Sequence, residues 1–177
     1  MHIQVAQASE LPEIAALVNS VYRGNSSRAG WTTEADFFEG ARTSAENLAH
    51  DLSAGPGRMF LTFREQANAP LVGCVYLQTG YGPSEEACYL GMLSVDATAQ
   101  AKGLGRLVMG AAEKKARELG STHMVLRVLS PRAELMAWYE RRGYRRTGEV
   151  SPFPYEKAAA ERPTRMDMQF IHFRKDL

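Results

Sequence analysis

The feature that most constrains this chain is a glycine-bearing turn at residues 100–106, Gln-Ala-Lys-Gly-Leu-Gly-Arg, which follows an apolar run ending at Val95. A helical pattern begins near Leu104. Because glycine has no Cβ, the backbone at Gly103 and Gly105 can direct successive N–H groups toward one point. The helix adds its unpaired first amides and the positive end of its dipole. We refer to residues 100–106 as the glycine turn, and it predicts a site for an anion such as a pyrophosphate.

Other interpretations of the glycine turn differ in strength. A Walker loop is excluded because no Gly-Lys-Ser/Thr sequence is present. A dinucleotide-binding fold is disfavoured because the third glycine of its fingerprint is missing. On the turn alone, a tight connection without any ligand stays open.

Composition limits the class of protein. With 177 residues and 45% hydrophobic content, we expect one domain over residues 1–177 with a sizeable core. The net charge of +1 argues against nucleic acid or an anionic membrane as a partner. A local basic cluster is predicted to be a solvated helix end and strand start; it comprises Arg141, Arg142, Arg145 and Arg146.

The remaining composition signals favour a cytoplasmic protein. No apolar run approaches the roughly 20 residues of a membrane span, and the N-terminus lacks a signal-peptide pattern. Cys74 and Cys88 fall in apolar runs, which predicts reduced, buried thiols. The histidines have no metal-ligand spacing, so we expect no metal. No Ser-His-Asp or Cys-His constellation indicates a covalent acyl-enzyme.

Hydrophobic periodicity and turn residues predict an alternation of helices and strands. Residues 23–30 are predicted as loop. Ser130 and Pro131 are expected to begin the last helix, with Ser130 as its cap, and Gly143 to end it. The strands 87–95 and 124–129 are joined through a helix, so we expect them to be parallel. The other predicted strands are 3–6, 58–63, 71–77, 144–149 and 165–173; the helices cover 9–22, a short stretch capped by Thr32 or Thr33, 43–55, 104–119 and 131–142.

Two motifs resemble those of the GNAT N-acetyltransferase superfamily. The glycine turn, after the strand 89–95, resembles the family's acyl-CoA-binding pattern Q-x-x-G-x-G. Residues 135–144, Leu-Met-Ala-Trp-Tyr-Glu-Arg-Arg-Gly-Tyr, resemble its other core motif, a helix with a tyrosine four residues before a Gly-aromatic pair. The resemblance implies an α/β (mixed α+β) fold with a central, mostly antiparallel sheet. Its parallel motif strands would be splayed, and about four to five helices would flank it.

The resemblance also implies an activity, namely direct transfer of an acetyl group from acetyl-CoA to an amine of a small molecule or peptide in a ternary complex. The N–H of Leu93 would stabilise the tetrahedral intermediate, and Tyr139 would protonate the leaving thiolate. Plain core packing is the alternative for both side chains. The implied acetyl-CoA contacts are Leu93, Val95, Gln100, Ala101, Lys102, Gly103, Leu104, Gly105, Arg106 and Tyr139.

The chain departs from the family pattern at two places. Arg132 stands where the family often has an asparagine that contacts the cofactor arm, so Arg132 or Ser130 is expected to make that contact. The family often places Glu or His on the motif strand, whereas the aligned residues here are Tyr89 and Gly91. The general base is therefore not identified, and the acidic candidates are Glu34, Glu85 and Glu86.

The acceptor pocket is expected between the loop around Trp31 and Glu34 and the loop carrying Phe153 and Tyr155, with Tyr89 beside them. Glu34 would hold a cationic amine or pass its proton to water, and Trp31 would form a wall. Alternatively, Trp31 pins the loop to the core and Glu34 stabilises a helix start.

Two other functions stay open on the sequence. A non-catalytic acyl-CoA-binding module is favoured by the missing base on the motif strand. An interaction protein would use the arginine cluster. Both a monomer and a homodimer are open.

Overall fold

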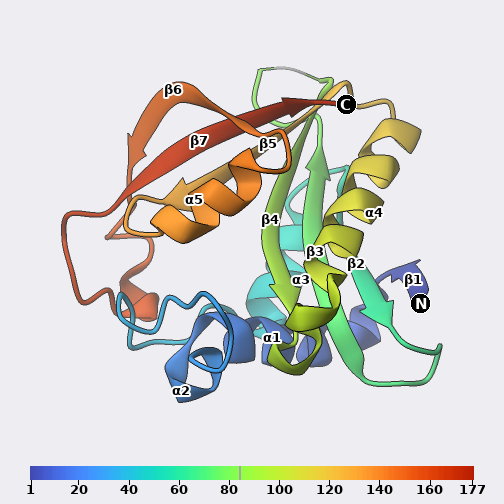
Figure 1. Cartoon of the computed structure of the whole chain (residues 1–177), viewed down its shortest axis with the longest axis horizontal. Helices are drawn as coiled ribbons and strands as arrows, with labels where there is room; N and C mark the ends of the chain where they lie inside the picture. Colours follow the sequence, from blue (N-terminus) through green and yellow to red (C-terminus); the bar gives the residue numbers. More distant parts are fainter. Residues whose placement is uncertain (84) are drawn as a thin grey trace.

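The computed structural model describes residues 1–83 and 85–177, apart from the side chains of residues 100–102. Within this part, seven strands form one sheet in the order β1-β2-β3-β4-β5-β7-β6 (Figure 1). Neighbouring strands are antiparallel except for β4 and β5, which are parallel as predicted. The strands are β1 (His2–Val5), β2 (Arg58–Arg64), β3 (Leu71–Thr79), β4 (Ala87–Val95), β5 (His123–Leu129), β6 (Arg145–Pro152) and β7 (Gln169–Asp176).

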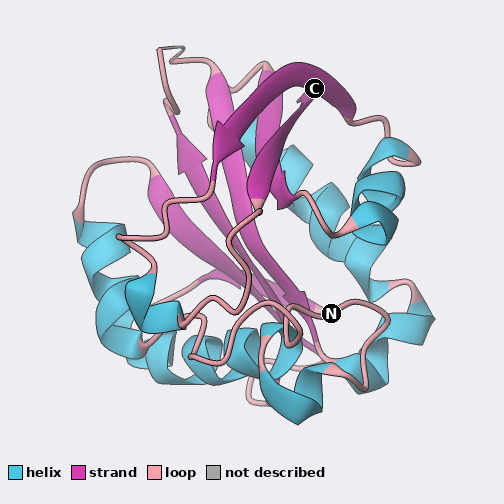
Figure 2. Cartoon of the chain, turned by 90° about the vertical axis from the view of Figure 1, so that its left-hand side faces the viewer, coloured by secondary structure: helices cyan, strands magenta, loops and turns pink. Residues whose placement is uncertain are grey.

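Helices cover both faces of the sheet (Figure 2). Alternating side chains of β2 and β3 explain this, because successive residues of a strand point to opposite faces. Phe60 and Tyr76 pack with α1 (Leu11–Tyr22) and α3 (Ala45–Ser53). Leu61 and Val75 pack with α4 (Leu104–Glu118) and α5 (Ala133–Glu140). The mixed, mostly antiparallel sheet between helices confirms the predicted fold.

The parallel strands β4 and β5 stay together over a short distance only. Their pairing runs from Ala87 with His123 to Tyr89 with Val125, although β4 continues to Val95. Beyond this the two strands diverge (Figure 1). On the other side of β4, the register to β3 shifts by one residue, and Met92 there has a positive φ of 45°. This is a β-bulge, which bends the strand and redirects its next residues.

The segment between α1 and α3 differs from the prediction. Residues 23–30 contain a short helix, α2 (Gly24–Ser27), and residues 31–38 form turns instead of a helix. The Thr33 hydroxyl accepts from the N–H of Ala35 within a turn. The chain then pairs with a distant segment, where the N–H of Gly40 donates to Glu161 O at 2.9 Å. Tertiary pairing therefore overrides the local helix signal.

The start of α5 also differs, whereas its end is as predicted. Ser130 does not cap the helix, because its hydroxyl accepts from the N–H of Gln169 at 3.1 Å and extends the β5–β7 ladder. Gly143 has a φ of +85°, and the following N–H of Tyr144 donates to Tyr139 O at 3.2 Å, which closes the helix. Strand β7 begins at Gln169, later than predicted. No described helix is long and apolar enough to cross a membrane.

Candidate active site

Two cavities are lined by residues of β4. We call the first the turn cavity; it has about 130 Å³ and is lined by Gly103, Gly105 and Arg106 of the glycine turn and by α5. We call the second the loop cavity; it has about 250 Å³ and lies between β4, β5 and the loops at Glu34 and Phe153. The cavities meet at a junction of shared lining residues, which are Tyr22, Leu93, Arg132, Leu135 and Tyr139.

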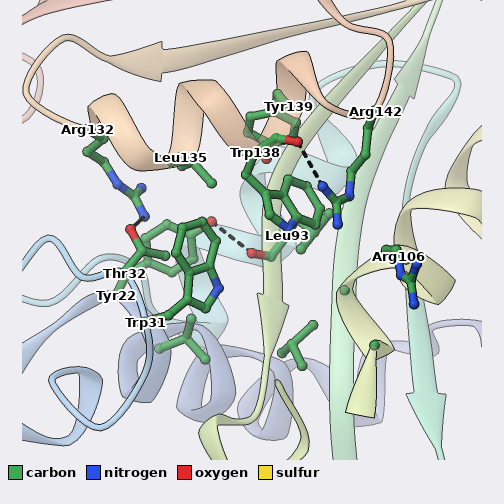
Figure 3. Close-up of a pocket in the computed structure, with 14 residues that line it drawn as sticks. Tyr22, Trp31, Thr32, Leu93, Arg106, Arg132, Leu135, Trp138, Tyr139 and Arg142 are labelled. Carbon is green, nitrogen blue, oxygen red and sulfur yellow. Dashed lines mark hydrogen bonds between the residues drawn. The ribbon is translucent and has the colours of Figure 1, made fainter. Parts of the chain in front are cut away.

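The junction contains the backbone of Leu93 from β4 and the side chain of Tyr139 from α5 (Figure 3). Leu93 follows the bulge, and its carbonyl accepts a hydrogen bond of 3.0 Å from the Tyr22 hydroxyl. Tyr139 is 6% exposed, and its hydroxyl has no hydrogen-bond partner among the described residues. Burial raises the pKa of Tyr139 above its ordinary value of 10.0. Tyr139 therefore stays protonated at neutral pH, with its hydroxyl free to donate.

The glycine turn has the conformation that an anion site needs. Gly103 is left-handed with a φ of +75°, and its carbonyl accepts from the N–H of Arg106 and of Leu107. Arg106 is the first residue whose N–H donates within this turn of the helix. The amides of Leu104 and Gly105 come before it in the chain, so the helix itself supplies no acceptor for them. A Cβ on Gly105 would lie 3.3 Å from Cζ2 of Trp138, so the indole packs directly on the turn.

Three further residues predicted for this site, Gln100, Ala101 and Lys102, have side chains outside the described part of the chain. Val95, for which the resemblance implies a contact with acetyl-CoA, lines the turn cavity. Ser130 lines neither cavity and belongs to the β5–β7 ladder.

Two arginines give the turn cavity positive charge. Arg142 stacks on Trp138, with its guanidinium carbon 3.6 Å from the ring centroid, and its Nη1 donates to Trp138 O at 2.9 Å. Burial, with the nearby charges of Arg141 and Arg106, lowers the pKa of Arg142. No carboxylate in the described part of the chain pairs with Arg106 or Arg142. Of the basic cluster predicted to be solvated, Arg141, Arg145 and Arg146 are exposed, whereas Arg142 is half-buried and lines the turn cavity.

Glu34 lies in a buried ionic cluster. Its Oε1 accepts from Nη1 of Arg132 at 2.7 Å, and its Oε2 accepts from Nη1 of Arg23. Its side chain is 7% exposed. Burial raises the pKa of this carboxyl, but Arg132, Arg23 and Arg42 outweigh burial, so the pKa is lowered. Glu34 is therefore a fixed carboxylate with both oxygens engaged, which makes it a weak proton acceptor.

Arg132, predicted as a cofactor contact, lines both cavities and connects the start of α5 to the loop before α3. Besides Glu34, it donates to the Thr32 hydroxyl at 3.1 Å (Figure 3). Its guanidinium carbon also lies 5.4 Å from the centroid of the Tyr22 ring. Arg132 thus fixes the wall that both cavities share.

The residues predicted for the acceptor pocket are distributed unevenly. Tyr89 and Phe153 line the loop cavity. Tyr155 packs against Phe153 with ring centroids 5.0 Å apart, and its hydroxyl accepts from the N–H of Met168, so it supports the wall from behind. Trp31 lines the turn cavity, with its ring centroid 6.4 Å from that of Trp138.

The two positions where the family often carries a base are occupied by one ring. A Cβ on Gly91 would lie 2.9 Å from Cε1 of Tyr89, so the tyrosine ring covers the glycine. Tyr89 also stacks on Tyr81 with a centroid distance of 4.7 Å. The other acidic candidates, Glu85 and Glu86, line neither cavity.

Besides Arg142, the residues of the site that sequence reasoning missed include Tyr22, Arg42 and Arg127. Arg127 carried a signal, because it is the one charge within the apolar run of β5. Tyr22 and Arg42 carried none, since one ends a helix and the other lies in a polar loop.

The structure also brings together a Ser-His-Glu set that the sequence did not reveal. The Ser151 hydroxyl lies 2.7 Å from Nε2 of His172, and Nδ1 of His172 lies 3.6 Å from Glu149. None of the three lines the turn cavity or the loop cavity. This set therefore adds nothing to the chemistry at the junction. The described residues contain no group of His, Cys, Asp or Glu that could hold a metal ion.

Comparison with known proteins identifies the family of the chain. Residues 26–144 match the model of the acetyltransferase (GNAT) family, and the chain belongs to this family. It is therefore an acyltransferase, as the two sequence motifs predicted. No curated protein matches the chain by sequence.

Solved structures share its fold. A ribosomal-protein-alanine N-acetyltransferase from Brucella melitensis has a TM-score of 0.70 at 18% identity, covering 100% of both chains. The ribosomal-protein-S18-alanine N-acetyltransferase from Escherichia coli has a TM-score of 0.65 at 16% identity, covering 99% of this chain and 92% of its own. A proposed streptothricin acetyltransferase from Bacillus anthracis, solved with acetyl coenzyme A, has a TM-score of 0.56 at 16% identity, covering 72% and 67%.

The Glu34 cluster predicts a pH-dependent stability. Because the pKa of Glu34 is lowered from 4.5, its stabilisation is complete above that value and is lost as the pH falls through the folded pKa. Glu34→Gln leaves the buried guanidinium of Arg132 without its anion and Arg23 with Glu161 alone, and it should cost about 3–5 kcal/mol at pH 7. Urea unfolding at pH 7 and at decreasing pH should show this loss, and a weaker acid sensitivity in the variant.

The control for this prediction is Asp36→Asn. Asp36 pairs with Arg28 at 2.6 Å, but both side chains are exposed, at 61% and 49%. The free energy of unfolding of this variant should be close to that of the wild type. Equal unfolding of Glu34→Gln and wild type at pH 7 would contradict the role of Glu34 as the anion of a buried cluster.

Proposed function

We propose that this enzyme transfers the acetyl group of acetyl-CoA directly to an amine of a small molecule within a ternary complex. The observation that carries the proposal is the junction, where the turn cavity and the loop cavity meet at Tyr139 and Leu93. The turn cavity has the glycine turn with Arg106 and Arg142, and the loop cavity has a polar lining of its own beyond the junction. A donor and an acceptor can therefore occupy the two cavities together and react where they meet.

The residues of the turn cavity fit acetyl-CoA. Its phosphates would be held by the amides of Leu104 and Gly105 and by the guanidiniums of Arg106 and Arg142. Because β4 leaves β5 beyond Tyr89, the edge of β4 is available to the amide groups of the cofactor arm. When bound, acetyl-CoA supplies an activated acetyl thioester.

Leu93 is positioned to stabilise the intermediate. In a β-strand, the N–H and C=O of one residue face the same neighbour. Since the carbonyl of Leu93 faces Tyr22 in the junction, we expect its N–H to face the junction as well. A fixed N–H at this place would bind the oxyanion formed when the amine attacks the thioester carbon.

Tyr139 is assigned as the proton donor to the leaving thiolate. In the reaction a C–N bond forms, the C–S bond breaks, one amine proton leaves to water, and the phenol proton goes to sulfur. Water then reprotonates the phenolate. Burial raises the pKa of Tyr139, and the same cause raises the pKa of a buried thiol, as for Cys74, to about 12. The pKa values of the phenol and the thiol therefore stay close enough for a proton to pass from Tyr139 to the sulfur.

The amine must lose a proton before it attacks. At an ordinary pKa of about 10.4, roughly one amine in a thousand is neutral near pH 7.4. Glu34 is a poor acceptor because Arg23 and Arg132 bind its two oxygens. We therefore assign the proton to water in the loop cavity.

The glycine turn gives a test of acetyl-CoA binding. Gly105→Val should place methyl groups against Trp138 and in the turn cavity, because a Cβ there already lies 3.3 Å from the indole. Acetyl-CoA at about 100 times its dissociation constant should stabilise the wild type by about 2.7 kcal/mol. The melting shift with acetyl-CoA should be lost in this variant.

Gly110→Val is the matched control, since Gly110 is in the same helix and a Cβ there meets nothing within 4 Å. It should keep the full shift with acetyl-CoA. An unchanged shift in folded Gly105→Val would contradict the placement of the phosphates.

If Tyr139 donates the proton, removing its hydroxyl should slow catalysis without weakening the binding of acetyl-CoA. Tyr139→Phe removes the donor but keeps the ring, so kcat should fall by about 10²–10⁴-fold while the melting shift with acetyl-CoA persists. CoA release with an accepted amine measures kcat.

Tyr144→Phe is the control for loss of a buried tyrosine hydroxyl. Tyr144 donates to Glu113 at 3.2 Å and lines neither cavity, so its variant should keep the wild-type kcat. Wild-type turnover by Tyr139→Phe would make Tyr139 a packing residue. Acetyl-CoA binding without CoA release for any amine would favour a non-catalytic module.

A further inference from the structure

The charges that line the loop cavity are unbalanced. Arg42, Arg127 and Arg132 line it, whereas its carboxylates are those of Glu34 and Glu161. Both carboxylates also bind Arg23, which lies behind the cavity wall. Arginine charge therefore exceeds carboxylate charge around this space, so the cavity favours an anion.

Arg127 supplies the unpaired cation. It lies within β5, and its guanidinium carbon is 4.8 Å from the ring centroid of Phe170 and 5.5 Å from that of Tyr89. No described residue forms an ion pair or hydrogen bond with its guanidinium. The two aromatic rings orient the side chain without neutralising its charge. Its donors remain available to a ligand.

Arg42 and Arg132 add further donors. The only ion pair of Arg42 within the described chain is with Glu161 at 3.8 Å, which is beyond a direct hydrogen bond. Arg132 is bound through Nη1 and Nη2, but its Nε is buried with no partner among the described atoms. The loop cavity thus has more guanidinium donors than its own carboxylates use.

We propose that the acceptor is an amine that also carries a carboxylate, such as a free amino acid, and that Arg127 binds this carboxylate with support from Arg42. This inference rests on the function proposed above. A planar guanidinium fork matches a carboxylate and binds it through two parallel hydrogen bonds. The amine of the same molecule would reach the junction at Leu93 and Tyr139, which line the same cavity.

The cluster also argues against the role expected of Glu34 as holder of a cationic amine. Its oxygens are bound by Arg23 and Arg132, and the net charge around it is positive. A cavity of about 250 Å³ suits a small molecule. The cavity therefore selects the acceptor by its carboxylate, and the amine of the acceptor is left free to react.

The test compares three matched acceptors for each side chain, namely the amino acid, its primary amide and its decarboxylated amine. The rate of CoA release is measured with each standard amino acid and its two analogues, and it gives kcat/KM for each acceptor. At least one amino acid should exceed its amide and its amine by about 10²-fold, because these leave the guanidinium without its anion. The proposal would be overturned if every amino acid had a kcat/KM no higher than that of its own amide or amine.

Variants assign the discrimination to Arg127. Arg127→Met should lower kcat/KM for the amino acid by about 10²-fold, through KM, and leave the amide and amine unchanged. Arg127→Lys should recover part of the loss, since it keeps the charge but not the fork. Arg42→Met should raise the KM for the amino acid by a smaller factor than Arg127→Met does. Arg117→Met, an exposed arginine of α4 outside both cavities, should change none of these values. Equal losses for all three acceptors in Arg127→Met would overturn the assignment.

Failure of the proposed function gives a different result. In that case no acceptor of any class releases CoA. Binding of the amino acids, measured by calorimetry on the wild type and Arg127→Met, then decides the anion site. Binding that the variant loses supports it, and binding that the variant keeps, or no binding by the wild type, contradicts it.

Discussion

The separation of β4 from β5 is the constraint on which the rest of the site depends. Parallel pairing holds the strands together through Tyr89 and Val125, after which they diverge. Buried backbone groups need partners, and divergence removes those that a sheet would supply. The Tyr22 hydroxyl satisfies the carbonyl of Leu93, and the remaining edge of β4 is available to a ligand. The bulge at Met92 places Leu93 where the two cavities meet.

Buried charge holds the rest of the junction in place. Glu34 binds Arg132, which immediately precedes α5, and Arg23 at the end of α1. Arg23 also binds Glu161 at the end of a short 3-10 helix (Ala159–Glu161). These contacts join segments far apart in sequence around one carboxylate. Such a cluster is costly to break because any unpaired charge stays buried. It fixes the wall of the loop cavity, and it leaves the arginine excess that selects the acceptor.

The sequence predicted the parts of the site that depend on local chemistry. The glycine turn, the ends of α4 and α5, and the parallel strands follow from glycine positions and hydrophobic periodicity. The loop from Arg23 to Gly40 was not predictable in this way, because Gly40 pairs with Glu161 and Glu34 with Arg132, about a hundred positions away. Ser130 resembled a cap but bonds to β7. The family resemblance pointed to Tyr89 and Phe153 of the loop cavity, whereas its arginines were missed, although the lone charge of Arg127 in an apolar strand was a signal.

The central claim is that two cavities meeting at Tyr139 permit direct transfer between two bound substrates. Initial rates measured over both acetyl-CoA and an accepted amine test it most directly, together with the intact mass of the enzyme after incubation with acetyl-CoA alone. The account predicts intersecting double-reciprocal lines and no gain in protein mass. Parallel lines, with a gain of one acetyl group that the amine then removes, would contradict it.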